Sequence, residues 1–162
     1  MNIFLRKISM LSVLFAMTAT SMGCGITEVV LVVAGDSTVQ MTAQNLRIQV
    51  LDTNGLLAYD ETLPVSEFAF PATMSITPSG SESAAFRVHI AASFPAMMVG
   101  GDELRSTRGT SFVEGESVRL DIPLFSRCRG VVCGVEQYCA ANAQCESDAV
   151  DPSTLPSWTG SP

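Results

Sequence analysis

The stretch FRVHI, residues 86–90, decides the fold. Apolar and polar residues alternate strictly along it, and a period of two is typical of a β-strand with one buried face. The same alternation returns at residues 46–50, 74–77 and 118–124. Each of these segments is therefore predicted to be a strand whose apolar side chains face a common core.

Other segments extend this pattern. The run VVLVVA at 29–34 is continuously apolar, which predicts a strand buried on both faces. Asp-Thr-Asn-Gly at 52–55 predicts a hairpin, because Asn-Gly supplies the positive φ angles of a type I′ turn, and the return strand begins at 57–59. A short strand is expected at 111–113. No convincing helical stripe appears after residue 24.

Together these segments predict an all-β protein. Short strands at this spacing favour a single antiparallel β-sandwich, immunoglobulin-like or transthyretin-like, over residues 29–125, and a small barrel is the alternative. A small disulfide-rich appendage is expected at 126–148. The last segment, 149–162, is rich in Pro, Ser and Thr without periodicity, which predicts a disordered tail.

The amino terminus is typical of an export signal. Arg6 and Lys7 precede a mostly apolar stretch at 8–19, which is too short for a membrane span but suits a secretory leader. Gly23 directly before Cys24 resembles the lipobox of bacterial lipoproteins, although Ser21 stands where that family usually has Leu. The resemblance implies a leader at 1–23, an acylated Cys24 and a short tether at 24–28.

The cysteine count agrees with this interpretation. Five is an odd number, and assigning Cys24 to lipid leaves an even set within 18 residues: Cys128, Cys133, Cys139 and Cys145. In an oxidising compartment these four are expected to form two disulfides, and the residues alone leave all three pairings open. A zinc site is disfavoured because the spacing C-x4-C-x5-C-x5-C lacks short C-x2-4-C pairs and a nearby His.

Charge and composition exclude several classes of function. Lys and Arg number 9 against 16 acidic residues, and without Arg6 and Lys7 the charge is −9, which argues against a nucleic-acid partner. His89 is the only histidine and is expected on the polar face of its strand beside Arg87. The sequence contains no Gly-x-Ser-x-Gly motif, so catalytic residues are not expected. It also contains no Gly-rich loop to hold a phosphate and no cysteine spacing typical of zinc, so cofactors and resident metals are not expected.

Three further features of the sequence are candidate ligand sites. The 52–55 segment resembles the start of a calcium loop but lacks its later ligands, so the hairpin is preferred. The acidic pairs at 60–61 and 102–103 are expected to point to opposite faces of their strands. Trp158 is the sole tryptophan and is interpreted as a tail residue, with an aromatic anchor for a partner or membrane as the alternative.

The layout resembles a broad class of small cell-surface lipoproteins of myxobacteria and related Gram-negative bacteria. The segments that carry the resemblance are Phe112–Gly115, Cys128–Gly134, Tyr138-Cys139, Cys145 and Val150–Trp158. Gln144 stands where the class commonly has Gly. The Cys-rich segment is also similar to half of an EGF-like module, and this analogy implies the pairs Cys128–Cys139 and Cys133–Cys145.

These observations predict a lipid-anchored protein of the cell envelope, at the outer membrane or cell surface, with a structural or protein-interaction role. The membrane partner is expected through the lipid on Cys24, and a protein or glycan partner in the envelope is compatible with the fold. The alternative is a carbohydrate- or peptide-binding module that uses the sandwich loops.

Overall fold

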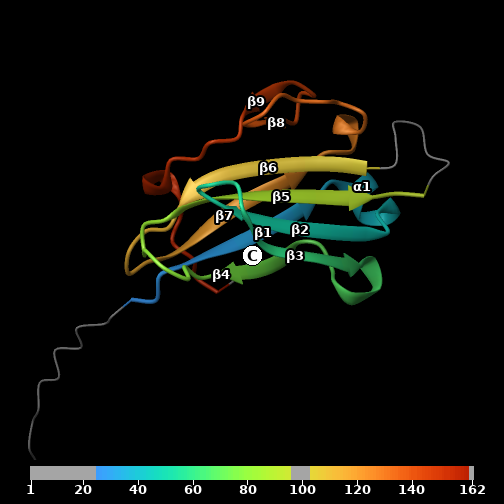
Figure 1. Ribbon diagram of the computed structural model, residues 1–162. Helices are drawn as coiled ribbons and strands as arrows, with labels where there is room; N and C mark the ends of the chain where they lie inside the picture. The colour runs from blue at the N-terminus through green and yellow to red at the C-terminus, as the bar shows by residue number, and fades with distance from the viewer. Residues whose placement is uncertain (1–24, 96–102, 161–162) are drawn as a thin grey trace, which may run out of the picture.

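The computed structural model describes residues 25–95 and 103–160 of the chain. The predicted leader at 1–23 and the predicted lipidation residue, Cys24, lie outside the described residues. Two β-sheets pack face to face, which confirms the predicted all-β sandwich (Figure 1). Sheet A has the strand order β4-β1-β7, and sheet B has the order β3-β2-β5-β6.

The strand bounds are as follows. Sheet A contains β1 (Glu28–Gly35), β4 (Ala72–Ile76) and β7 (Ser117–Leu124). Sheet B contains β2 (Asn45–Asp52), β3 (Leu57–Pro64), β5 (Ala85–Ser93) and β6 (Glu103–Ser111). A two-stranded sheet follows, made of β8 (Gln137–Cys139) and β9 (Cys145–Ser147).

The core lies between the two sheets and follows the predicted alternation. Along β5 the buried side chains are every second residue, Phe86, Val88, Ile90 and Ala92, and β7 shows the same pattern. Each fully buried Leu or Ile contributes about 1.5–3 kcal/mol through removal of apolar area from water. All of 29–33 in β1 is buried, as the continuous apolar run predicted.

One strand pairing differs from the predicted antiparallel sandwich. β1 runs parallel to β7 from the pair Glu28–Ser117 to the pair Gly35–Leu124, while the other four pairings in the two sheets are antiparallel. A parallel pair needs a long connection between its strands. The chain provides one, because β1 and β7 are the first and last strands of the sandwich.

The strand β6 was not predicted. The prediction of a separate short strand at 111–113 is wrong, because Ser111 is the last residue of β6. The residues of β6 that share a face with Leu104 are Ser106, Arg108 and Thr110, and Ser106 and Thr110 are buried. The strand therefore lacks the apolar alternation that marked its neighbours. Pairing with all nine residues of β5 is what holds it in place.

A short helix that was not predicted, α1 (Ser37–Thr42), follows β1. Asp36 is its N-cap: the carboxylate accepts a hydrogen bond from the Val39 N–H at 3.0 Å, and Val39 is buried. Six residues are too few to show a helical stripe, which explains why the helix was missed. No helix in 25–95 or 103–160 is long and apolar enough to span a membrane.

The same carboxylate joins the end of β1 to the start of the C-terminal module. Asp36 also accepts hydrogen bonds from the N–H and hydroxyl of Ser126, at 2.7 and 2.8 Å, where the 3-10 helix η2 (Ser126–Cys128) begins. Burial raises the pKa of Asp36, but the hydrogen bonds from Val39 and Ser126 outweigh it and hold the pKa below its usual value. The charged form is therefore the one the fold stabilises.

The predicted hairpin between β2 and β3 is present, with a different turn. Gly55 has φ +75°, whereas Asn54 is not among the residues with positive φ, so the turn is not type I′. The Gly55 N–H donates to the Asp52 carbonyl at 3.0 Å, and the Asp52 carboxylate accepts from the N–H groups of Asn54 and Leu56, both at 2.8 Å. This is a longer loop with glycine in the left-handed region.

The predicted tether is part of the folded body from Gly25 onward. Thr27 is buried, and its hydroxyl oxygen accepts a hydrogen bond from the Gly115 N–H at 2.8 Å. A Cβ at Gly25 would lie 1.8 Å from the Gly115 carbonyl oxygen, so only glycine fits this approach. β1 itself begins at Glu28, within the predicted tether of 24–28.

The prediction of a disordered tail is wrong for 149–160. The Val150 N–H donates to the Gly109 carbonyl on β6 at 2.8 Å, and the Trp158 N–H donates to the Ser117 carbonyl on β7 at 2.8 Å. Val150 and Leu155 pack against the core. Asp151 caps the 3-10 helix η3 (Pro152–Thr154), and Pro152 occupies the first position of that helix. The composition of the segment did not distinguish a proline in this role from a proline in a disordered tail.

Candidate functional site

The C-terminal module, residues 126–148, contains the predicted pair of disulfides. Cys128 is bonded to Cys139 and Cys133 to Cys145, with Cα–Cα separations of 5.8 and 5.5 Å. This confirms the pairing implied by the EGF-like analogy and removes the zinc alternative, since all four sulfurs are bonded to sulfur. Within the described residues, no group of three or more His, Cys, Asp or Glu side chains is placed to hold a metal ion.

The two disulfides differ in environment. Cys128 and Cys139 are 3% and 6% exposed and belong to the main core cluster, whereas Cys145 is exposed. The first bridge therefore joins the module to the hydrophobic core of the sandwich. In the second bridge only Cys133 packs against this cluster, at its periphery, so this bridge mainly cross-links the module, which is too short to build a core of its own.

A buried charge also holds the module against sheet B. Asp148 has a fully buried side chain, and its Oδ2 lies 3.1 Å from Arg87 Nε on β5. The Arg87 Nη2 also reaches Glu136 Oε1 at 3.1 Å. The backbone of Asp148 is fixed on both sides, because its N–H donates to the Glu136 carbonyl at 2.9 Å and its carbonyl accepts from the Gly109 N–H at 3.0 Å.

Two cation–π contacts complete the docking. The Arg108 guanidinium on β6 lies 3.3 Å from the centre of the Tyr138 ring on β8. The Arg129 guanidinium, just after η2, lies 4.3 Å from the centre of the Phe94 ring. Both contacts join the module to the sandwich through the flat faces of aromatic rings, which attract cations.

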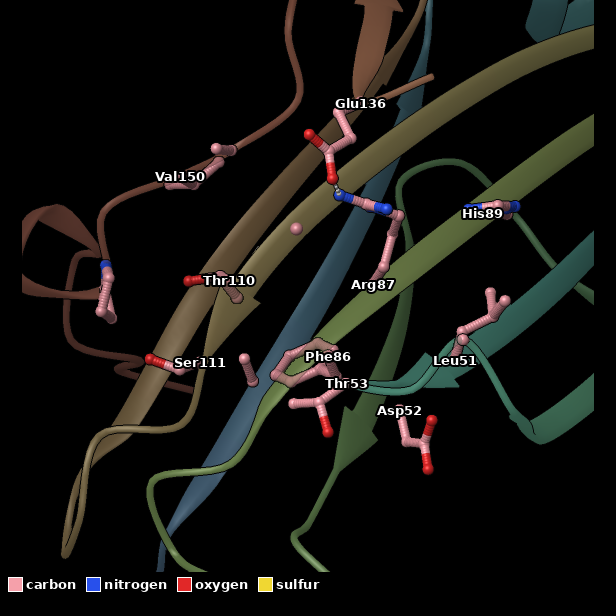
Figure 2. A pocket seen from close by; sticks show the side chains of 15 residues that line it. Leu51, Asp52, Thr53, Phe86, Arg87, His89, Thr110, Ser111, Glu136 and Val150 are labelled. Atoms are coloured by element: carbon pink, nitrogen blue, oxygen red, sulfur yellow. Dashed lines mark hydrogen bonds and ion pairs between the residues drawn. The ribbon is translucent and has the colours of Figure 1, made fainter.

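A cleft forms where the module and tail meet sheet B. We call this the junction cleft; it is bounded by the hairpin loop 52–55, by β5 and β6 at Phe86 and Thr110, by Glu136 of the module and by residues 149–152 (Figure 2). Its volume is about 490 Å³. The Thr110 hydroxyl is buried and has no hydrogen-bond partner in the described part of the chain.

His89 lies in the junction cleft, half-buried, on the same face of β5 as Arg87, as predicted. Burial lowers the pKa of His89 below its usual value, the nearby Arg87 and Arg105 charges lower it further, and Asp148 opposes them. Ser111 lies at the other end of the cleft (Figure 2). It pairs with Ala85, four residues along β5 from His89, about 13 Å away in a strand, so the two side chains do not form a catalytic pair.

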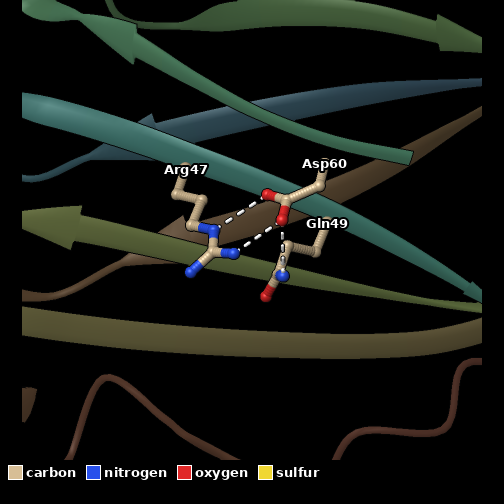
Figure 3. A network of polar contacts seen from close by, with 3 residues as sticks. All are labelled: Arg47, Gln49 and Asp60. Carbon is tan, nitrogen blue, oxygen red and sulfur yellow. Dashed lines mark hydrogen bonds and ion pairs between the residues drawn. The ribbon is translucent and has the colours of Figure 1, made fainter. Parts of the chain in front are cut away.

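A second polar network lies on the exposed outer face of sheet B. The Arg47 guanidinium makes two hydrogen bonds to the Asp60 carboxylate, at 2.8 and 2.6 Å, and Gln49 donates to the same carboxylate at 3.2 Å (Figure 3). The hydrogen bond from Arg47 lowers the pKa of Asp60, although partial burial opposes it. Asp60 and Glu61 point to opposite faces of β3, as predicted, since their partners on β2 are Gln49 and Ile48.

Sequence reasoning identified the four cysteines and placed His89 on the polar face of its strand, but it missed the Arg87, Glu136 and Asp148 cluster. Its members are up to 61 residues apart in the chain, and no local pattern relates them. The sequence shows only that Arg87 and Asp148 are charged; nothing in their local sequence indicates that the two side chains pair. Asp102, one of the predicted acidic pair at 102–103, lies outside the described residues, and Glu103 contacts Arg105.

No protein-family model and no curated protein sequence matches the chain. Among solved structures, the chain is similar to a fimbrial assembly protein from Parabacteroides distasonis, with 13% sequence identity and a TM-score of 0.39. The match covers 60% of this chain and spans about half of that protein, 51% of its length. A similarity of this extent assigns no function.

Proposed function

We propose that this chain is a lipid-anchored protein of the cell envelope with a structural or protein-interaction role and no catalytic activity. One observation carries the proposal: Cys128, Cys133, Cys139 and Cys145 are bonded in pairs, so Cys24 is the one cysteine left over. Disulfides persist in oxidising compartments, which supports export. Cys24 follows an apolar leader, which supports acylation there.

The packing of Gly25 gives this anchor a geometric consequence. Gly25 lies against the Gly115 backbone, so the folded body begins one residue after Cys24. One residue spans at most about 3.6 Å. A lipid on Cys24 would therefore hold this end of the sandwich directly at the membrane surface, with the outer membrane or cell surface as the proposed location.

Replacing Cys24 with serine is expected to abolish membrane attachment. Stable anchoring needs two or more acyl chains, each stabilised by about 0.8 kcal/mol per buried CH₂, and Cys24→Ser removes the site of attachment. Cells expressing the full chain should incorporate an alkyne-tagged fatty acid into the wild-type protein and not into the variant. Ser21→Leu, which restores the usual lipobox residue, is the matched control and should keep the label. Equal membrane fractionation of all three proteins would refute the anchor.

The junction cleft favours a second candidate function, the binding of a carbohydrate. The loop 52–55 and the carboxylate of Glu136 border a hollow of about 490 Å³ with the unpartnered Thr110 hydroxyl in its wall. Hydroxyl donors of a sugar are suited to carboxylate acceptors. The exposed loop of the sandwich would then supply specificity, as loops commonly do.

Titration of the full chain, purified in mild detergent, with chitotriose or maltotriose tests this candidate. Saturable amide shifts at Thr53 and Thr110 are expected, and Glu136→Gln should weaken binding about tenfold through loss of a charged acceptor. Glu114→Gln, an exposed acidic residue outside the cleft, should leave binding unchanged. Absence of shifts with both sugars would count against this function.

A further inference from the structure

The two lateral edges of the sandwich differ in whether another segment pairs with them. On one side, the tail pairs with β6 at Gly109 and with β7 at Ser117, and the module lies beside β6 (Figure 1). On the other side, β3 and β4 are the last strands of their sheets, and no strand in the described part of the chain pairs with their outer edges. Unpaired edges present free N–H and C=O groups that can accept another strand.

Sheet A is one strand narrower than sheet B on this open side. Residues directly opposite each other in a pair share a face, so Tyr59, Glu61 and Leu63 of β3 face the core side together with their buried partners on β2. Tyr59 and Glu61 are nevertheless exposed. The position in sheet A that would cover them, beyond β4, is unfilled by the described chain.

A groove marks this position. We call it the edge groove; it has a volume of about 430 Å³ and reaches the buried core residues Val33 and Ile48. Met74 of β4 and Phe68 add further apolar wall, and Phe68 packs edge-to-face on Phe70 at 5.2 Å. Most of the side chains that line the edge groove are therefore apolar, and some of them belong to the hydrophobic core.

The charge of the edge groove has one sign. Glu61 and Glu67 line it, and no Lys, Arg or His among residues 25–95 and 103–160 does. The Tyr59 hydroxyl donates to the Glu61 carboxylate, but this neutral donor leaves the negative charge uncompensated. Arg47 does not compensate either, because it pairs with Asp60 on the opposite face of the sheet.

We propose that the free edge of β4 accepts an extended segment of a partner protein, which adds a fourth strand to sheet A and fills the edge groove. The segment has alternating apolar side chains that enter the groove, with one Lys or Arg among them facing Glu61. Backbone hydrogen bonds to β4 hold the strand, and the inward side chains give specificity. This deepens the proposed protein-interaction role by naming its surface and the chemistry of its partner.

A second copy of the chain is a poorer occupant. β4 itself, ATMSI, carries no cation to meet Glu61. Two copies joined edge to edge would place the Glu61 and Glu67 carboxylates of both chains around one dry groove, and like charges at an interface are strongly unfavourable. The whole chain, at −7, also repels its own copies.

The capped peptide Thr-Val-Thr-Lys-Thr-Val-Thr tests the proposal on the full chain in mild detergent. Its alternate residues, Val, Lys and Val, would face the groove. Saturable amide shifts are expected at Thr73, Ser75 and Tyr59, together with slower hydrogen exchange of the β4 amides. The same peptide with Glu in place of Lys should bind about tenfold more weakly, because an attraction to Glu61 becomes a repulsion.

Variants of the chain supply the second arm. Glu61→Gln should weaken the Lys peptide about fivefold and remove its advantage over the Glu peptide. Glu114→Gln, exposed and outside the groove, should change neither value. Far-UV circular dichroism checks that both variants keep the wild-type fold.

Four results would overturn the proposal. These are equal affinity for the two peptides, shifts confined to the junction cleft, no saturable shift with either peptide at millimolar concentration, and a peptide-free dimer with protected β4 amides. The last would assign the edge to a second copy. Membrane fractionation of Cys24→Ser is independent of peptide binding, so failure here and failure of the lipid anchor are distinguishable.

Discussion

Replacing Arg87 with alanine is expected to lower the free energy of unfolding by about 3–5 kcal/mol, the usual cost of leaving a buried charge without its partner. The partner left behind is Asp148, whose side chain is fully buried. Neither of its carboxylate oxygens accepts a hydrogen bond of ordinary geometry within the described residues. The Arg87 charge at 3.1 Å is therefore what compensates it.

Urea unfolding followed by circular dichroism measures this loss. The double variant Arg87→Ala with Asp148→Asn should recover much of the stability, because no uncompensated charge then stays buried. Arg47→Ala is the matched control, since Arg47 also pairs with an aspartate on sheet B but is 49% exposed, and it should have a much smaller effect. Equal losses for Arg87→Ala and Arg47→Ala would show that burial of Asp148 has no energetic role.

Removing residues 149–162 is expected to destabilise the sandwich by about 3 kcal/mol, and to make it prone to aggregation. Three backbone hydrogen bonds to β6 and β7 are lost, each contributing about 1 kcal/mol. The contacts of Val150 and Leu155 with the core cluster are also lost. The edges of both sheets on this side then become available for pairing with other molecules.

Thermal unfolding and light scattering of the truncated chain measure these effects. Removal of 159–162 alone is the control, because it spares Val150, Leu155 and the Trp158 hydrogen bond. In the intact chain, the fluorescence of Trp158, the sole tryptophan, should change at the same temperature as the β-sheet circular dichroism signal. A truncated chain as stable as the intact one would mean that the tail contributes nothing to the fold.

The proline and serine content of residues 149–162 predicted disorder, whereas residues 149–160 are held by contacts with β6, β7 and the core. Composition measures whether a segment can bury enough apolar surface by itself. Here the tail packs on a surface that other segments form. Leu155 contacts a core made by other strands, and the backbone N–H of Trp158 donates to the Ser117 carbonyl. Neither partner is near the tail in the sequence.

β5 and β6 make the same point for strands. The alternation at 86–90 is visible because its inward residues are apolar, and the buried face of β5 confirms it. β6 pairs with every residue of β5, yet most of the residues on its Leu104 face are polar, so no periodic signal exists. A strand held by its neighbour needs no alternation of its own.

The sequence by itself determined the all-β class, the sandwich core of alternating strands, the hairpin at 52–55 and the identity of the four bonded cysteines. These features depend on residue type and spacing within a few positions of the chain. Only the tertiary structure decided that Asp148 is buried on Arg87, that the tail covers β6 and β7, and that β3 and β4 have free edges. Each of these features depends on which distant segments come into contact. The free energy of such a contact depends on both segments together, so the sequence of either segment alone does not reveal it.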